Sequence, residues 1–222
     1  RDSSEDSLKI NPPVAIVEAQ GYVYAAYYSI ISIMEEISKN KDKNSEDIRK
    51  RAIELKKKFN KDYWMDREKY LALALDGTKE QRKVVTSNPG HMLFPGIVDE
   101  DKQDFVVNRL FQPDMWTPYG IRTHSTKAPD FDPYSYHFGS IWPQDNWIIY
   151  KGLQKFGYST QVEKIKQALL RVYKELHKIP EYYIVIDNKI IDPSIPTKSM
   201  SYVRANPLQA WASAALLEIL GA

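Results

Sequence analysis

The sequence predicts an all-α fold in two layers, with an inner ring of helices covered on both faces and an outer ring that faces water. About six segments show helical spacing of apolar residues, and few segments alternate as strands do. The helical segments also switch between nearly all-apolar and amphipathic, which is typical of buried and surface helices packed in layers. At 222 residues, 43% of them hydrophobic, the chain can bury a large core, and no composition shift marks an internal boundary.

The first two predicted helices illustrate this contrast. From Pro13 to about Ile37 the chain reads PVAIVEAQGYVYAAYYSIISIMEEI, with acidic residues only at Glu18 and near its end. We expect a helix with so little polar surface to be buried on most sides. Residues 45–60 instead carry apolar side chains at helical spacing and a basic run, RKRAIELKKK, so they predict an amphipathic surface helix.

The middle of the chain predicts shorter elements and one long loop. YLALALDG (70–77) is either a short strand or an irregular connection, and SNPGHMLFPG (87–96) is too rich in Gly and Pro for regular structure. A helix is predicted over 101–111, and further helices over 144–156, 160–178 and 207–220. Between them, residues 112–143 form a loop with five prolines and many aromatic residues. Loops of that length in a compact domain are generally functional.

Composition excludes several classes of function. Lys and Arg number 31 against 29 Asp and Glu, so the net charge of +2 does not favour nucleic acid as a partner. The absence of cysteine excludes thiol catalysis and disulfides, and we expect a cytoplasmic protein. No apolar run has membrane-spanning length, so no membrane partner is expected. The four histidines lack metal-ligand spacing, and no nucleotide-binding or serine-hydrolase motif occurs, so we expect no metal and no cofactor. Among catalytic mechanisms, acid–base chemistry by carboxylates remains the best option.

Two carboxylates have unusual settings. Glu181 follows Pro180 and precedes two tyrosines in KIPEYYIV, where aromatic rings would desolvate it and raise its pKa toward that of a useful base. The alternative is a loop glutamate held by backbone donors. Asp2 lies in RDSSEDS, a segment that by itself is typical of a frayed terminus.

The loop that ends in GSIWPQDN predicts a carbohydrate site, because aromatic rings stack on sugar C–H faces and nearby polar groups bond the hydroxyls. The polar candidates are Arg122, His137 and Asp145, and the stacking candidates are Tyr136, Trp142 and Trp147. A structural interpretation stays open, in which the two tryptophans are core residues and Asp145 caps the following helix.

Several strings together resemble a known family. These are VEAQGYVYAA (17–26), SNPGHMLFPG (87–96), YGIRTHS and DPYSYHFGSIWPQDN (within 119–146), IPEYY (179–183) and LQAWASAALL (208–217). They resemble the catalytic region of glycogen-debranching proteins, the amylo-alpha-1,6-glucosidase-like set of six-hairpin glycosidases. The resemblance runs in order over nearly the whole chain, and GSIWPQDN is its most specific piece.

The resemblance implies an (α/α)6 toroid that hydrolyses alpha-glucosidic bonds with inversion. The family's acid lies in a Trp-[Lys/Arg]-Asp-Ser context, which Asp2 matches, and its base lies in a Leu-Pro-Glu segment, which Glu181 matches. In inverting hydrolysis the acid protonates the leaving oxygen while the base activates a water on the opposite ring face, at a separation of roughly 6.5–9.5 Å. The positions that match the family's glucose subsite are Glu18, Gln20, Arg122, His137, Trp142 and Asp145.

Departures from the family pattern bear on substrate identity. The chain has Pro118-Tyr119-Gly120 where relatives often read GWG, Phe131-Asp132-Pro133 where they read YNP, and His124 in place of a usual leucine. We expect them to affect substrate identity more than reaction type.

Length is the larger departure. A toroid of twelve helices takes on the order of 300–400 residues, so we expect residues 1–222 to be the C-terminal half of the catalytic domain, with the N-terminal half of the barrel as its partner. The expected substrate is an oligo- or polysaccharide. Two alternatives stay open: a related toroid hydrolase of the trehalase, invertase or mannosidase type, and a carbohydrate-binding helical module without catalysis.

Overall fold

The computed structural model describes residues 11–38, 43–195 and 202–221, and within these ranges the chain is mainly helical. Six α-helices are described: α1 (Val17–Ser38), α2 (Lys43–Asp62), α3 (Glu100–Leu110), α4 (Pro143–Lys155), α5 (Ser159–Leu176) and α6 (Ala210–Leu220). All six were predicted, and the ends of α3, α4 and α5 differ from the predicted ones by at most two residues. A 3-10 helix, η1 (Asn88–Leu93), lies in the segment for which no regular structure was expected.

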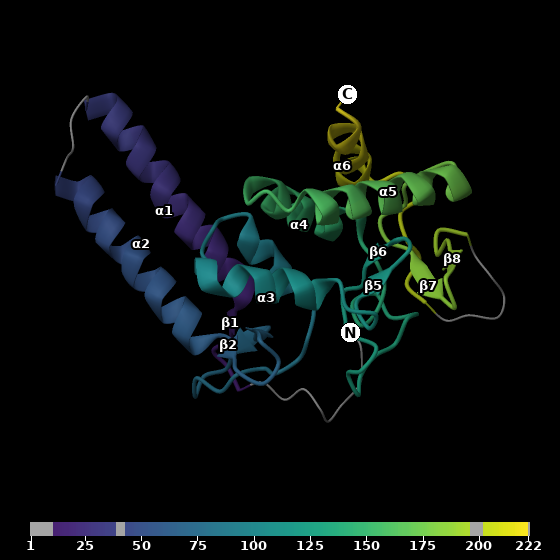
Figure 1. The fold of residues 1–222 in the computed structure, drawn as a ribbon, viewed down its shortest axis with the longest axis horizontal. Helices are drawn as coiled ribbons and strands as arrows, with labels where there is room; N and C mark the ends of the chain where they lie inside the picture. The colour runs from purple at the N-terminus through teal and green to yellow at the C-terminus, as the bar shows by residue number, and fades with distance from the viewer. Residues whose placement is uncertain (1–10, 39–42, 196–201, 222) are drawn as a thin grey trace.

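Five of the six described helices form two groups, and α3 lies between them (Figure 1). Helices α1 and α2 make a long antiparallel pair, while α4, α5 and α6 pack together at the other end (Figure 1). The 3-10 helix joins the two groups, because it contacts both α1 and α4. Its approach to α1 depends on Gly21, where a Cβ atom would collide with the Met92 side chain.

Helix α1 differs from its prediction in burial. Only Val17, Gly21 and Ile31 are buried, whereas Ile33 is 58% exposed and Ile37 is 78% exposed. Among the described elements, α1 packs mainly against α2, η1 and β1, and several apolar side chains on its other faces are exposed. The sequence pattern therefore predicts more packing partners than the described part of the chain provides.

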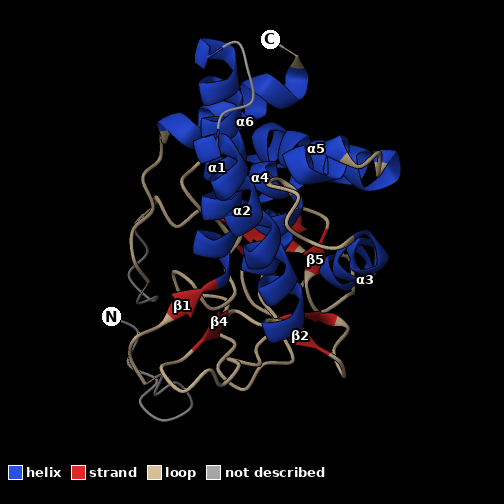
Figure 2. Ribbon diagram, turned by 90° about the vertical axis from the view of Figure 1, so that its left-hand side faces the viewer, coloured by secondary structure: helices blue, strands red, loops and turns tan. Residues whose placement is uncertain are grey.

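Eight strands of two or three residues form four antiparallel pairs. They are β1 (Ala15–Ile16) with β4 (Ala74–Leu75), β2 (Trp64–Met65) with β3 (Tyr70–Leu71), β5 (Trp116–Thr117) with β6 (Gly120–Ile121), and β7 (Ile184–Ile186) with β8 (Lys189–Ile191). Strands β1, β2 and β4 lie at the end of the molecule opposite α6 (Figure 2). The strand pairs hold the connecting segments in place beside the helices, and the β5–β6 pair lies within the long aromatic loop.

The larger core cluster joins α4, α5, α6 and η1 to the β5–β6 hairpin. A smaller cluster has Tyr182, Ile184 and Ala205 at its centre, and the aromatic rings of Tyr136 and Trp142 pack against it. This second cluster lies directly beside Glu181 in the chain. No helix in the described part of the chain is long and apolar enough to cross a membrane.

Candidate active site

A pocket of about 550 Å³ lies between the start of α1, the 3-10 helix, the aromatic loop and the start of α4. Four residues that the sequence singled out line it: Glu18, His137, Trp142 and Asp145. They come from segments up to 127 residues apart (145 − 18), so the fold brings distant motifs to one cavity.

Asp145 is held by a histidine rather than by the helix backbone. It lies in the first turn of α4, but no side-chain cap is formed there, and its Oδ1 lies 2.5 Å from His91 Nε2. A carboxylate only accepts, so Nε2 carries the proton, and Nδ1 lies 3.3 Å from the Tyr22 hydroxyl oxygen. Burial first, and then the charges of Glu18 and Asp145, raise the pKa of Tyr22 and keep that hydroxyl protonated. The interpretation of Asp145 as a helix cap is therefore wrong.

The two carboxylate oxygens of Asp145 differ in their contacts. Asp145 Oδ2 is buried from water and has no hydrogen-bond partner among the described residues. The same holds for the Thr86 hydroxyl oxygen in the same pocket wall. Buried polar atoms without partners are costly, so these two oxygens are among the least satisfied polar atoms of this pocket wall.

Glu18 enters the pocket from the first turn of α1. Its Oε1 accepts a hydrogen bond from the Asn88 side-chain amide of η1. The contact ties α1 to the 3-10 helix at the pocket wall. Sequence reasoning missed Asn88 and His91 as site residues, although both lie in SNPGHMLFPG, one of the strings that carries the family resemblance.

Trp142 forms the aromatic wall. The His137 ring stacks on it with ring centres 5.9 Å apart, and Tyr182 stacks on it at 5.5 Å. Its indole nitrogen donates to the Tyr136 carbonyl and the Ser140 hydroxyl, each at 3.1 Å, which fixes the ring plane. Trp147 is not part of this wall, because its indole donates to Glu218 of α6 at 2.9 Å.

Glu181 lies beside this wall, held by two donors. The Tyr136 hydroxyl donates to its Oε1 at 2.6 Å, and the Asn206 backbone N–H donates to its Oε2 at 3.0 Å. Burial and then the bond to Glu181 raise the pKa of Tyr136 to about 12, so the phenol stays a donor across the physiological range. The edge of the Tyr136 ring meets Trp142 with centres 4.7 Å apart, which connects Glu181 to the pocket wall.

Two polar candidates, Arg122 and Gln20, lie outside the pocket lining, as do Tyr136 and Glu181. The Arg122 guanidinium is buried and donates to the Gly139 and Val185 carbonyls at 3.2 and 2.8 Å, and desolvation lowers its pKa. It therefore joins the aromatic loop to the β7–β8 hairpin. The Gln20 amide donates to the Ile16 carbonyl at 3.4 Å.

A charged cluster that sequence reasoning did not find completes the pocket. His124 Nε2 lies 2.8 Å from Asp130 Oδ1, and an Arg82 guanidinium nitrogen lies 3.6 Å from Asp130 Oδ2. The Asp130 side chain is only 4% exposed. The leucine-to-histidine departure noted in the sequence thus has a partner, because the His124 imidazole forms a hydrogen bond with the buried Asp130 carboxylate.

Asp2, the candidate acid, lies outside the described residues, so its role as the acid stays a prediction. Within residues 11–38, 43–195 and 202–221, no group of three or more His, Cys, Asp or Glu side chains is arranged to hold a metal ion.

Solved structures share this fold. Mannosylglycerate hydrolase from Thermus thermophilus, in complex with glucose, aligns with 94% of this chain and 48% of its own at a TM-score of 0.71 and 16% identity. Neutral trehalase Nth1 from Saccharomyces cerevisiae aligns with 94% of this chain and 38% of its own at a TM-score of 0.71 and 14% identity. The helices therefore have the arrangement found in (α/α)6 toroids, as predicted.

The family follows from the sequence. Residues 2–194 match the model of the mannosylglycerate hydrolase MGH1-like glycoside hydrolase domain, and the chain belongs to that family. Mannosylglycerate hydrolase from Rubrobacter radiotolerans is 22% identical over 175 residues, which cover 77% of this chain and 36% of that protein. Mannosylglycerate hydrolase MGH1 from Selaginella moellendorffii is 28% identical over 91 residues, 41% of this chain and 18% of that protein.

These comparisons support a six-hairpin glycosidase and not its glycogen-debranching member specifically. They also show how much of each relative's length this chain covers. It spans about a third or less of the curated relatives it matches and just under half of the Thermus structure.

Proposed function

We propose that this chain supplies the base and a large part of the sugar pocket of an inverting glycoside hydrolase, with Glu181 as base and Asp2 as acid. The observation that carries the proposal is the family match over residues 2–194, which contains both carboxylates. The structure adds that Glu181 is held in place beside an aromatic pocket wall.

Each carboxyl has a defined task in the proposed reaction. Glu181 takes a proton from a water molecule, whose oxygen attacks the anomeric carbon from one face of the ring. Asp2 gives its proton to the glycosidic oxygen as the bond to the leaving group breaks on the other face. The bonds from Tyr136 and from the Asn206 backbone hold both oxygens of Glu181, so the carboxylate does not have to reorient before it accepts the proton.

The pocket residues hold the sugar in this proposal. Trp142, on which His137 and Tyr182 stack, borders the sugar with the part of its ring that lines the pocket, and the Asp145 and Glu18 carboxylates accept hydrogen bonds from sugar hydroxyls. His137 stacks on Trp142 and borders the same space. We assign Arg122 to support of the loop and leave Gln20 out of the sugar contacts, because neither lines the pocket.

For the substrate we propose a mannosylglycerate-type glycoside, since the family and the relatives reported above carry that name. The second candidate is an alpha-glucoside of the debranching type, which the string GSIWPQDN favours. The two differ in the released sugar. Incubating the full-length protein with mannosylglycerate, maltose and an alpha-1,6-linked glucoside, and quantifying free mannose and glucose, separates them.

The sugar that is released distinguishes the proposed functions. Release of mannose supports the first substrate, and release of glucose alone supports the second. Sugar binding without any release contradicts a hydrolase and supports the non-catalytic carbohydrate-binding module.

We also propose that residues 1–222 are the C-terminal half of the catalytic domain and that an N-terminal half covers the open helix faces. Large apolar side chains on α1 and α6 are exposed: Tyr22, Val23, Ile30, Ile33 and Ile37 on α1, and Trp211, Leu217 and Leu220 on α6. Exposed apolar surface of this extent is typical of faces that pack against another body. Residues 1–222 expressed alone should bind a hydrophobic dye and self-associate, and a monomeric, cooperatively unfolding fragment that binds no dye would contradict the half-barrel assignment.

A further inference from the structure

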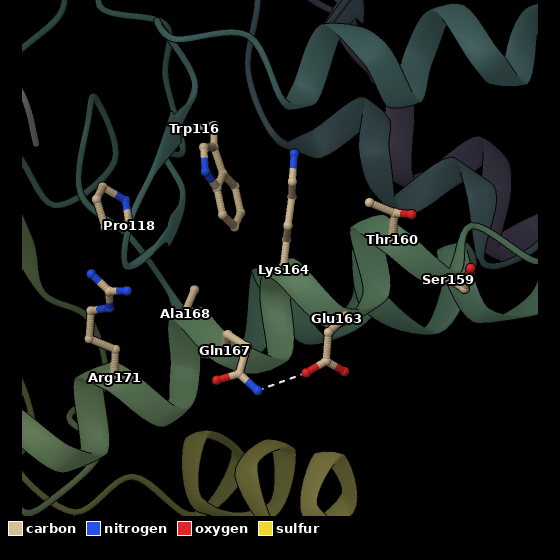
Figure 3. A pocket seen from close by; sticks show the side chains of 9 residues that line it. All are labelled: Trp116, Pro118, Ser159, Thr160, Glu163, Lys164, Gln167, Ala168 and Arg171. Carbon is tan, nitrogen blue, oxygen red and sulfur yellow. Dashed lines mark hydrogen bonds between the residues drawn. The ribbon is translucent and has the colours of Figure 1, made fainter.

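A second pocket, of about 780 Å³, lies on the outer side of α5 beneath the β5–β6 hairpin. None of its lining residues belongs to the candidate active site. Figure 3 shows Lys164 and Arg171 rising from α5 toward the hairpin, which contributes Trp116 and Pro118. We call this space the α5 groove.

The aromatic wall of the α5 groove is held rigidly. The Trp116 ring packs against Phe111 with centres 4.9 Å apart, and it is only partly buried, so one part of the indole faces the groove. Ala168 lies on the helix side and leaves room opposite the ring. An indole face beside open space suits the C–H face of a sugar ring.

Two cations flank this ring. Lys164 and Arg171 are seven residues apart on α5, which places them about 10 Å apart along the helix axis. Lys164 Nζ lies over the Phe111 ring at 5.7 Å, and the Arg171 guanidinium lies over the Tyr119 ring at 5.9 Å, so aromatic neighbours orient both.

Neither cation is neutralised within the described residues, because no carboxylate lies within 4.0 Å of either one. The acidic residue in the groove lining, Glu163, already accepts a hydrogen bond from Gln167 at 2.7 Å. The groove therefore combines a stacking surface with an excess of positive charge.

We propose that the α5 groove binds a sugar that carries an anionic group, either a carboxylate or a phosphate, at a site separate from the catalytic pocket. The pyranose ring stacks on Trp116, and Lys164 or Arg171 pairs with the anion. This site does not depend on the proposed reaction, since it shares no residue with it.

The test is calorimetric titration of the full-length protein with glucuronate, glucose 6-phosphate, glucose and inorganic phosphate. We expect one or both anionic sugars to bind at least tenfold more tightly than glucose and than inorganic phosphate. Comparison of the two anionic sugars distinguishes a carboxylate from a phosphate ligand. In the double variant Lys164→Gln/Arg171→Gln, binding of the preferred sugar should weaken at least tenfold.

The matched control is Lys166→Gln/Lys174→Gln, which removes two charges from the same helix outside the groove lining. It should bind within twofold of the unmodified protein. A Trp116→Leu variant should also lose the preference for an anionic sugar over inorganic phosphate, and circular dichroism melting establishes that each variant is folded.

Three results would overturn the proposal. They are equal binding of glucose and the anionic sugars, equal binding of inorganic phosphate and the anionic sugars, and a folded Lys164→Gln/Arg171→Gln variant that binds as the control does. The catalytic assignment would stand in all three cases, because its test measures turnover.

Discussion

Replacing Tyr136 by Phe tests how the candidate base is held. The substitution removes the hydroxyl that donates to Glu181 Oε1 at 2.6 Å and keeps the ring, whose edge meets Trp142 and Tyr182 with centres 4.7 and 5.1 Å apart. The aromatic cluster should therefore remain packed, while Glu181 keeps only the backbone donor of Asn206.

The size of the effect follows from the bond that is lost. A hydrogen bond to a charged group is worth about 1.5–3 kcal/mol, and every 1.36 kcal/mol in the barrier is a factor of ten in rate. If that bond keeps the Glu181 carboxylate in its reactive orientation, kcat should fall by about 10- to 150-fold. Substrate KM should change little, because Tyr136 does not line the sugar pocket.

The assay is steady-state hydrolysis of whichever glycoside the substrate panel identifies. Tyr134→Phe is the matched control on the same loop, because its hydroxyl has no hydrogen-bond partner among the described residues. A folded Tyr136→Phe variant whose kcat stays within twofold of the control would refute the positioning argument.

Two further predictions concern stability. Asn146→Leu removes a buried amide that accepts from the Ile121 N–H at 2.7 Å and donates to its carbonyl at 3.1 Å. The Ile121 N–H and carbonyl would then lack a partner, at a cost of about 1–3 kcal/mol each, so the free energy of unfolding in urea should fall by about 2–6 kcal/mol. A loss no larger than that of the exposed control Asn108→Leu would contradict a stabilising role for the Asn146 amide. Alkaline pH should also destabilise the fold. The pKa values of Tyr136 and Tyr158 are raised from 10.0 to about 12 by burial and by bonds to carboxylates. The unfolded chain therefore loses these protons at lower pH than the folded chain, and the free energy of unfolding should fall between about pH 10 and 12. A free energy of unfolding from denaturant titrations that is constant over this range would contradict the prediction.

Helix positions could be read from the sequence because hydrophobic spacing is a local property. The pattern of α5 predicted its start and end within two residues, and the basic run of α2 is largely exposed as expected. The β7–β8 hairpin was not predicted, although its two-residue turn at Asp187 and Asn188 has positive φ at both positions, a geometry that Asn and Asp tolerate well.

Partners distant in sequence could not be predicted, because no local pattern reports them. Tyr136 and Glu181 are 45 residues apart, and His91 and Asp145 are 54 apart. Composition indicated which residues suited a sugar site, but only the fold decides that Asp145 faces the pocket. It also decides that Arg122 turns away to bond backbone carbonyls.

Turnover of the full-length Glu181→Gln variant, compared with the exposed control Glu80→Gln, decides whether Glu181 is the base of a glycoside hydrolase. The amide keeps the shape of the side chain but cannot take a proton from water, so hydrolysis should drop by roughly a thousandfold or more while sugar binding persists. Turnover of Glu181→Gln within tenfold of the control would contradict this assignment.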